Sequence, residues 1–206
     1  MFQINWKLKA FLYKVFQFLK LKNTFYFIQK YITRRSRVNI SEINPHWIRH
    51  QTSIKNNSCK NLLEIGGGKS LEQNIYFSYV FNGKLEQTVI DINKMIDFQF
   101  FNKASKQISN LLNFEFKGDV SNQEEIFNKY NIKYLAPYKL NDLNEKKFDI
   151  CVSTTTLEHF TLEDLNNFLS DIKKNLKTNG LVSSLIDYSD HYSHKNKNIN
   201  SLNFLK

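Results

Sequence analysis

The chain is poor in the residues that shape small disulfide-rich or fibrous folds. Its 206 residues include two cysteines, two prolines and six glycines. Cys59 and Cys151 cannot build a disulfide framework, which suits a reducing compartment and a fold held by its own hydrophobic core. No apolar run approaches the roughly 18 residues that a membrane-spanning helix needs. Lysines also interrupt any signal-peptide core. The sequence therefore predicts a globular cytoplasmic protein.

Acidic residues are missing from the first fifth of the chain. Residues 1–41 contain nine lysines and arginines and no acid, whereas the remaining 165 residues contain 20 basic and 19 acidic side chains. The net charge of +10 therefore lies almost entirely in this first segment. The rest is close to neutral, which argues against a nucleic-acid groove. We predict a basic extension over residues 1–40, a domain over residues 41–206 and no nucleic-acid partner.

The basic extension carries an apolar stripe with the spacing of a helix. Two interpretations of it stay open. A basic, aromatic-rich amphipathic helix predicts peripheral contact of residues 1–37 with the inner face of the membrane. Alternatively, the helix covers a cofactor site as a lid. The stripe consists of Leu8, Phe11, Leu12, Val15, Phe16 and Leu19.

Three of the six glycines stand next to one another at residues 66–68. Residues 62–68 read Leu-Leu-Glu-Ile-Gly-Gly-Gly, and residues 88–92 read Thr-Val-Ile-Asp-Ile. Glycine is needed where the backbone takes a positive φ or approaches a ligand closely, so we expect ligand contact at 66–68. Two apolar strands that each lead to a carboxylate are typical of a parallel α/β sheet that binds a nucleoside-bearing cofactor.

Three kinds of cofactor loop compete for residues 66–68. A phosphate-binding P-loop is excluded, because its first glycine would stand at Leu63. A dinucleotide fingerprint is weakened by Leu71, which stands where the third glycine belongs. A loop for a cationic cofactor is favoured, because Glu64 would attract an ammonium or sulfonium group and repel a pyrophosphate.

Residues 64–70 read Glu-Ile-Gly-Gly-Gly-Lys-Ser. They resemble the first motif of the class I S-adenosylmethionine-dependent methyltransferases, [DE]-x-G-x-G-x-G, with Ser70 in place of the last glycine and as a helix N-cap. The resemblance implies a Rossmann-like three-layer sandwich with a mostly parallel sheet, and S-adenosyl-L-methionine as cofactor. It assigns cofactor binding to Glu64 and to Gly66, Gly67 and Gly68. Asp91 would bond the ribose hydroxyls, with Ile92 beside it.

The resemblance continues along the chain. Phe114 and Phe116 alternate with charged residues and predict strand three. The Gly-Asp pair that follows at 118–119 resembles the family's adenine-contact segment, which implies that Asp119 and Val120 contact the adenine. Residues 131–147 are predicted as a surface loop. Residues 148–152 predict strand four, and Ser153 follows as a cofactor contact. The Leu-Glu-His sequence at 157–159 is similar to a segment that faces the methyl-transfer site in the family.

Candidate catalytic residues follow strands four and five. His191 is the preferred general base and His159 the second candidate. The spacing of acids and histidines in this region matches no standard metal site, so no metal is predicted. We also expect a helix from about residue 162 that ends at Asn179-Gly180, and strand five at 181–186.

A complete class I sheet has two more strands than this chain supplies. The 19 residues after Asp187 are too few for a helical crossover and a hairpin, so we expect an incomplete sheet, which means either a truncated chain or a sheet edge supplied from elsewhere. The principal hypothesis is O- or N-methylation of a small-molecule, glycan or lipid-linked acceptor. A methyltransferase-fold protein without turnover is the second, and a nicotinamide-dependent oxidoreductase is the third, disfavoured by Glu64 and Leu71.

Overall fold

The computed structural model describes residues 38–143 and 147–187, and four positions of the first 37. The chain divides into two units, 38–186 and the two terminal segments. Phe11, Val15 and Phe18 are helical, and the side chains of Phe11 and Phe18 are exposed. Among the residues described, no helix has the length and apolar character needed to cross a bilayer. The membrane and lid interpretations of residues 1–37 stay predictions.

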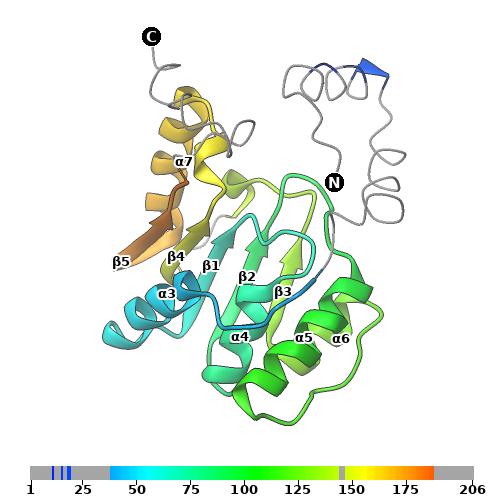
Figure 1. Cartoon of the computed structure of the whole chain (residues 1–206). Helices are drawn as coiled ribbons and strands as arrows, with labels where there is room; N and C mark the ends of the chain where they lie inside the picture. Colours follow the sequence, from blue (N-terminus) through cyan, green and yellow to red (C-terminus); the bar gives the residue numbers. More distant parts are fainter. Residues whose placement is uncertain (1–10, 12–14, 16–17, 20–37, 144–146, 188–206) are drawn as a thin grey trace, which may run out of the picture. The chain divides into compact units, whose positions relative to one another are not determined.

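The larger unit is built on a five-stranded parallel sheet (Figure 1). Along the sheet the strand order is β3-β2-β1-β4-β5, and every neighbouring pair is parallel. From β1 the chain adds β2 and β3 on one side of the sheet, and it then returns to add β4 and β5 on the other side. This reversal creates a switch point at the carboxyl ends of β1 and β4. The strands are β1 (Asn61–Ile65), β2 (Glu86–Ile90), β3 (Ile132–Leu135), β4 (Phe148–Thr154) and β5 (Leu176–Leu185).

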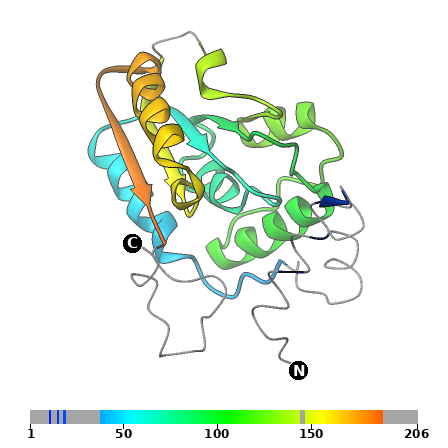
Figure 2. The same cartoon turned by 90° about the horizontal axis from the view of Figure 1, so that it is seen from above.

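Helices cover both faces of the sheet, so the predicted three-layer sandwich is confirmed. Leu62 packs in a core with α3, α4, α5 and α6, whereas its neighbour Leu63 packs in a second core with α7 on the opposite face. Figure 2 shows α7 across the sheet from α4. The helices are α3 (Pro45–Asn56), α4 (Glu72–Val80), α5 (Phe98–Leu112), α6 (Gln123–Tyr130) and α7 (Leu162–Asn175), with short 3-10 turns η2 (Leu140–Asp142) and η3 (Leu157–His159).

Strand three was predicted in the wrong place. Residues 114–117 form no strand. Instead, the Phe114 ring stacks on Tyr79 of α4 at 5.9 Å, and the Lys117 ammonium lies 5.2 Å from the centre of the same tyrosine ring. The alternating aromatic pattern therefore serves packing on helices. The true β3 lies within the segment predicted as a loop, where Ile132 and Tyr134 are buried and the strand is too short for a clear period.

Strand five begins earlier than predicted. α7 ends at Asn175, and β5 starts at once with Leu176. Leu176 pairs with Phe148 and Leu181 pairs with Ile150, so the segment between them bulges out of register. Asn179, with φ 67°, lies in this bulge and does not end the helix. β5 is the edge strand of the described sheet. The predicted incompleteness of the sheet concerns residues 188–206, which lie outside the described residues.

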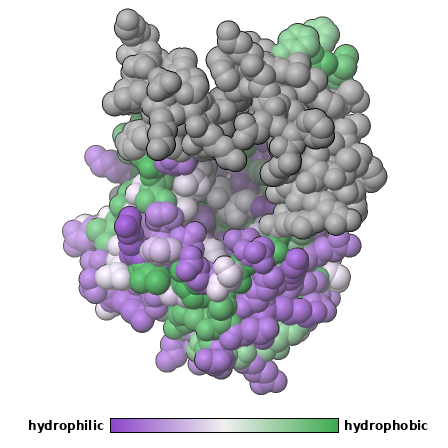
Figure 3. Space-filling view, viewed as in Figure 1, coloured by the Kyte–Doolittle hydropathy of each residue, from purple (hydrophilic) through white to green (hydrophobic). Residues whose placement is uncertain are grey.

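Hydrophilic side chains predominate on the described surface in the view of Figure 3, with hydrophobic side chains in smaller patches between them. Single exposed apolar residues are normal on a folded domain. The features that concern function lie at the carboxyl ends of the strands.

Candidate functional site

The glycine turn follows β1 directly and is tied to the end of β2. The backbone N–H of Gly66 donates to the carbonyl of Ile90 at 3.0 Å. A Cβ at Gly66 would collide with the Thr156 hydroxyl, and a Cβ at Gly67 would lie 2.6 Å from a methyl group of Leu71. Gly68 has a φ of 73° and faces open space. Packing within the protein thus explains two of the glycines, and only Gly68 leaves room for a ligand.

The helix after this turn is not capped as predicted. The N-cap of α4 is Leu71, in a left-handed conformation with φ 49°, and Ser70 does not cap the helix. The Ser70 hydroxyl instead donates to the Glu72 carboxylate at 2.8 Å. Leu71 buries its side chain almost fully, which offsets the cost of a left-handed non-glycine residue.

Glu64 lies beneath α4, with 3% of its surface exposed. The amide of Asn74 donates to Glu64 Oε2 at 2.7 Å. Burial raises the pKa of Glu64 to about 8, and the negative field of Asp91 adds to this shift, whereas the Gln73 and Asn74 amides oppose it. Glu64 is therefore largely protonated at neutral pH, and a cationic ligand would favour its ionised form.

Asp91 lies at the carboxyl end of β2 and is 8% exposed. Burial raises its pKa to about 6, opposed by hydrogen bonds from the Tyr134 hydroxyl and the Gly67 backbone N–H. Its Oδ2 atom is buried and has no hydrogen-bond partner among the described residues. A buried acceptor without a donor is costly, so this atom is suited to a ligand hydroxyl. Ile92, next along the chain, is 76% exposed.

Tyr134 was missed by the sequence analysis, because it lies in the segment predicted as a loop. Its hydroxyl accepts from the Met95 backbone at 3.0 Å and bonds to Asp91. One side chain on β3 therefore fixes both the Asp91 carboxylate and the loop after β2. Ile132 and Tyr134 do alternate with exposed Lys133, but a strand of four residues is too short for this alternation to be a clear signal.

The segment after β4 forms the other side of the switch point. Thr156 packs against Gly66, which confirms that the glycine turn and this segment meet. Ser153 is fully buried, and its hydroxyl has no partner within the described ranges. Both carboxylate oxygens of Glu158 are also buried without a described hydrogen-bond partner. Several polar atoms that lack partners thus surround the end of β4.

Asp119 and Val120 do not follow strand three, so the premise of their predicted adenine contact is wrong. Asp119 is exposed and pairs with Lys106 at 3.1 Å. Val120 is buried in the core, and its backbone exchanges two hydrogen bonds with Asn102 of α5. The residues that follow β3 are 136–138, and the backbone N–H of Tyr138 donates to the Asp91 carbonyl at 2.9 Å.

The structure describes one of the two predicted catalytic histidines, His159. His159 is exposed in η3, and its backbone N–H donates to the Thr156 carbonyl at 3.1 Å. His191 lies outside the described residues. Within the part of the chain that the structure describes, no group of three His, Cys, Asp or Glu residues is arranged to hold a metal ion.

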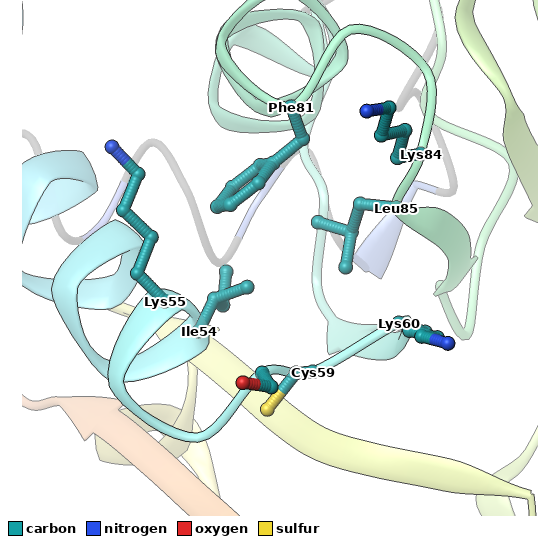
Figure 4. Close-up of a pocket in the computed structure, with 8 residues that line it drawn as sticks. Ile54, Lys55, Cys59, Lys60, Phe81, Lys84 and Leu85 are labelled. Carbon is teal, nitrogen blue, oxygen red and sulfur yellow. The ribbon is translucent and has the colours of Figure 1, made fainter.

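A separate pocket of about 270 Å³ lies at the amino ends of β1 and β2, at the opposite end of the strands (Figure 4). Cys59 lies in its wall, and burial raises the pKa of this thiol, so the cysteine is not an activated nucleophile. The pocket takes no part in the site at the strand ends. Its lining residues are Ile54, Lys55, Ser58, Cys59, Lys60, Phe81, Lys84 and Leu85.

We predict that Glu64→Gln stabilises the protein at alkaline pH. Between pH 4.5 and about 8 the folded chain keeps a proton on Glu64 that the unfolded chain has lost, so stability falls as pH rises through this window. Glutamine does not titrate, so the Glu64→Gln variant does not lose stability in this way as the pH rises. We expect a gain of about 4 kcal/mol at pH 8 that shrinks to about 1 kcal/mol at pH 5, measured by thermal unfolding. The exposed Glu115→Gln is the control, and a gain independent of pH would contradict the prediction.

Comparison with known proteins identifies the family. A model of a family described as a methyltransferase domain matches residues 63–184, which is more than half of the chain. None of the curated proteins matches the sequence. Solved structures with a similar fold include the PH0226 protein of Pyrococcus horikoshii, with 14% identity, a TM-score of 0.39 and coverage of 64% of this chain and 51% of that one.

Two further solved structures are similar. TehB from Haemophilus influenzae has 18% identity and a TM-score of 0.42, over 75% of this chain and 42% of that chain. A SAM-dependent methyltransferase from Archaeoglobus fulgidus has 18% identity and a TM-score of 0.35, over 75% and 53%. The chain thus spans about half the length of these proteins. Structural similarity at this level does not indicate a function.

The range of the family match contains residues of the site. It includes the glycine turn, Asp91 and the segment after β4, and the strand order places these three at one switch point. The chain belongs to the class I S-adenosylmethionine-dependent methyltransferases.

Proposed function

We propose that this chain transfers the methyl group of S-adenosylmethionine to an oxygen or nitrogen atom of a small-molecule, sugar or lipid-linked acceptor. The observation that carries the proposal is the buried Oδ2 atom of Asp91, which has no partner among the described residues and lies at the end of β2. A ribose hydroxyl supplies the hydrogen bond that this atom lacks.

The residues present fit the remaining parts of the cofactor. Glu64 is a buried carboxyl group that a positive charge would ionise, which suits the cationic methionine end. Gly68 leaves open space at the turn. Exposed Ile92 offers an apolar surface beside Asp91. These groups lie at the carboxyl ends of β1 and β2, beside the switch point where α/β sheets bind nucleotides.

Bound S-adenosylmethionine supplies an electrophilic methyl group for an in-line displacement. The task of the protein is then to orient the acceptor against the cofactor and to exclude water. An oxygen acceptor also needs a group that takes up its proton. His159, at the end of η3, is the candidate within the described residues, and His191 is the preferred candidate from the sequence. The class of the acceptor is part of this proposal, and so is the contribution of residues 188–206 to its binding.

A nicotinamide-dependent oxidoreductase fits the site less well. A pyrophosphate at the glycine turn would meet two buried carboxyl groups, Glu64 and Asp91. Close helix packing in the dinucleotide motif also uses a glycine where this chain buries the full side chain of Leu71. NADH therefore serves as the negative control in the binding experiment described next.

The first test is calorimetric titration of the full chain with S-adenosylhomocysteine, with NADH in parallel. We expect micromolar binding of S-adenosylhomocysteine, and we expect Asp91→Ala to weaken it by about tenfold or more, the cost of one buried charge-assisted hydrogen bond. Asp119→Ala is the matched control, because this exposed aspartate pairs with Lys106 away from the strand ends. Binding of NADH alone, or equal binding by wild type and Asp91→Ala, would contradict the proposal.

The affinity for S-adenosylhomocysteine should rise with pH between 6 and 8. The free protein holds Glu64 protonated below its pKa of about 8, and binding of the ligand's ammonium group must remove this proton. We expect an increase of about fiftyfold across this range and a net release of protons, visible as heats that depend on the buffer. Glu64→Gln should bind weakly, with a much smaller change. A flat profile in the wild type would contradict this role of Glu64.

We also propose that residues 1–37 contact the membrane surface. Deletion of this segment should abolish binding to anionic liposomes and leave the affinity for S-adenosylhomocysteine unchanged, because the domain of residues 38–186 is a separate unit. Co-sedimentation and calorimetry of the two forms measure the two properties. Loss of cofactor affinity with liposome binding retained would support the lid interpretation instead.

A further inference from the structure

The pocket at the amino ends of β1 and β2 has an apolar interior of about 270 Å³. Ile54 and Leu85 in its wall belong to the buried core beneath α3 and α4, and Phe81 and Cys59 pack against the same core. Figure 4 shows the side chains of Phe81 and Leu85 pointing toward the middle of the pocket. The volume lies just below that of sites for drug-sized ligands, so it suits a body of about one ring.

Backbone hydrogen bonds hold the two loops that wall the pocket. The N–H of Cys59 donates to the Ile54 carbonyl at 3.0 Å, which fixes the loop after α3. The N–H of Glu86 donates to the Lys60 carbonyl at 2.8 Å, which joins the loop before β1 to the loop before β2. The pocket is thus formed before a ligand arrives, which lowers the cost of binding.

Three lysines, Lys55, Lys60 and Lys84, stand around this apolar interior. All three are exposed. Within the described ranges, none of their ammonium groups makes a hydrogen bond or an ion pair. The ion pairs in that part of the chain are formed by other lysines, namely Lys106, Lys174 and Lys177.

The carboxyl ends of α3 and α4 do not use these ammonium groups either. A lysine near the end of a helix can bond to the last carbonyl groups. Here backbone N–H groups cover such carbonyls: Ser58 donates to the carbonyl of Lys55 at 3.1 Å, and Lys84 donates to the carbonyl of Phe81 at 3.0 Å. The three positive charges therefore stay available to a ligand.

Nearby acidic residues do not neutralise the three lysines. Asp149 Oδ1 pairs with the Lys177 ammonium at 2.8 Å, and its Oδ2 accepts from the backbone N–H groups of Lys60 and Asn61, each at 2.8 Å. Glu86 opens β2 with an exposed side chain and is not part of the pocket wall. The mouth of the pocket is therefore positively charged, and its interior is apolar.

We propose that this pocket binds a small phosphate monoester whose organic part is an apolar body of about one ring. The body fills the space beside Phe81 and Leu85, and the phosphate lies at the mouth among the lysine ammonium groups, which act on it as point charges. The pocket lies at the opposite end of the strands from Asp91. The binding therefore goes beyond methyl transfer and does not rest on it.

The test is a titration of the full chain with phenyl phosphate, followed by ¹H–¹³C NMR of the methyl groups of Ile54 and Leu85. Inorganic phosphate and phenol, which each carry one half of the probe, are titrated separately. We expect saturable shifts with a Kd of about 1 mM or lower for phenyl phosphate, and binding of either half that is weaker by about tenfold or more. The methyl signals of Ile90, at the other end of β2, should not move.

Lys60→Gln and Lys84→Gln should each weaken the binding of phenyl phosphate by about threefold, the effect of one exposed ion pair. Added salt should weaken it as well, because exposed charges are screened. Lys103→Gln is the matched control, because it removes the same charge from an exposed lysine of α5 that lies outside the pocket wall. All three changes lie on the surface and should leave the fold intact.

Cys59 gives a second readout in the same sample. Of the two cysteines, Cys151 is fully buried and Cys59 is partly exposed in the pocket wall. Phenyl phosphate should therefore slow the alkylation of Cys59 by N-ethylmaleimide at the concentrations that shift the methyl signals. Inorganic phosphate at the same concentrations should leave the rate unchanged.

Three outcomes would overturn the proposal. They are the absence of methyl shifts with phenyl phosphate, equal binding of phenol and phenyl phosphate, and shifts confined to the carboxyl ends of the strands, at Ile90 or Ile92. Equal weakening by Lys103→Gln and Lys84→Gln would do so too. S-adenosylhomocysteine takes no part in this titration, so its result is independent of the function proposed above.

Discussion

The burial of one carboxyl group, Glu64, is the constraint on which the site depends. Glu64 lies at the end of β1 beneath α4, where solvation is lost and only amide groups replace it. Such a group is costly unless its surroundings are polar, and the hydrogen bond from the Asn74 amide meets part of this need. The same burial keeps Glu64 protonated in the free protein, so a ligand that brings positive charge gains most from the site.

The glycine turn and the segment after β4 fit one another as two packed surfaces. Gly66 has no Cβ because Thr156 occupies that space, and Gly67 lies against Val89 and Leu71. Glycine here permits close approach of protein to protein, as well as the positive φ of the turn. A rigid turn of this kind holds Glu64, Gly68 and Asp91 in fixed places before a ligand arrives, which lowers the cost of binding.

Much of the fold could be predicted from local sequence patterns, and the predictions that were wrong have physical causes. β1, β2 and β4 are apolar runs that end at polar residues, so their chemistry marks them. β3 has four residues, too few for a period, and the aromatic alternation at Phe114 and Phe116 serves contacts with helices. That one error removed the basis for predicting the adenine contact at Asp119 and Val120, and it hid Tyr134. The helix cap failed at Ser70 because the buried side chain of Leu71 fixes the turn.

The sequence by itself determined the residues that stand directly after strands: Glu64 with the glycine turn, and Asp91. Their place follows from chain order, because parallel strands end at one edge of the sheet. Only the tertiary structure decided the state of these groups. Tyr134 reaches Asp91 from β3, which is far from β2 in the sequence but next to it in the sheet, and Asn74 of α4 donates to Glu64. Burial and long-range hydrogen bonds set protonation and orientation, and neither is encoded in any local stretch of residues.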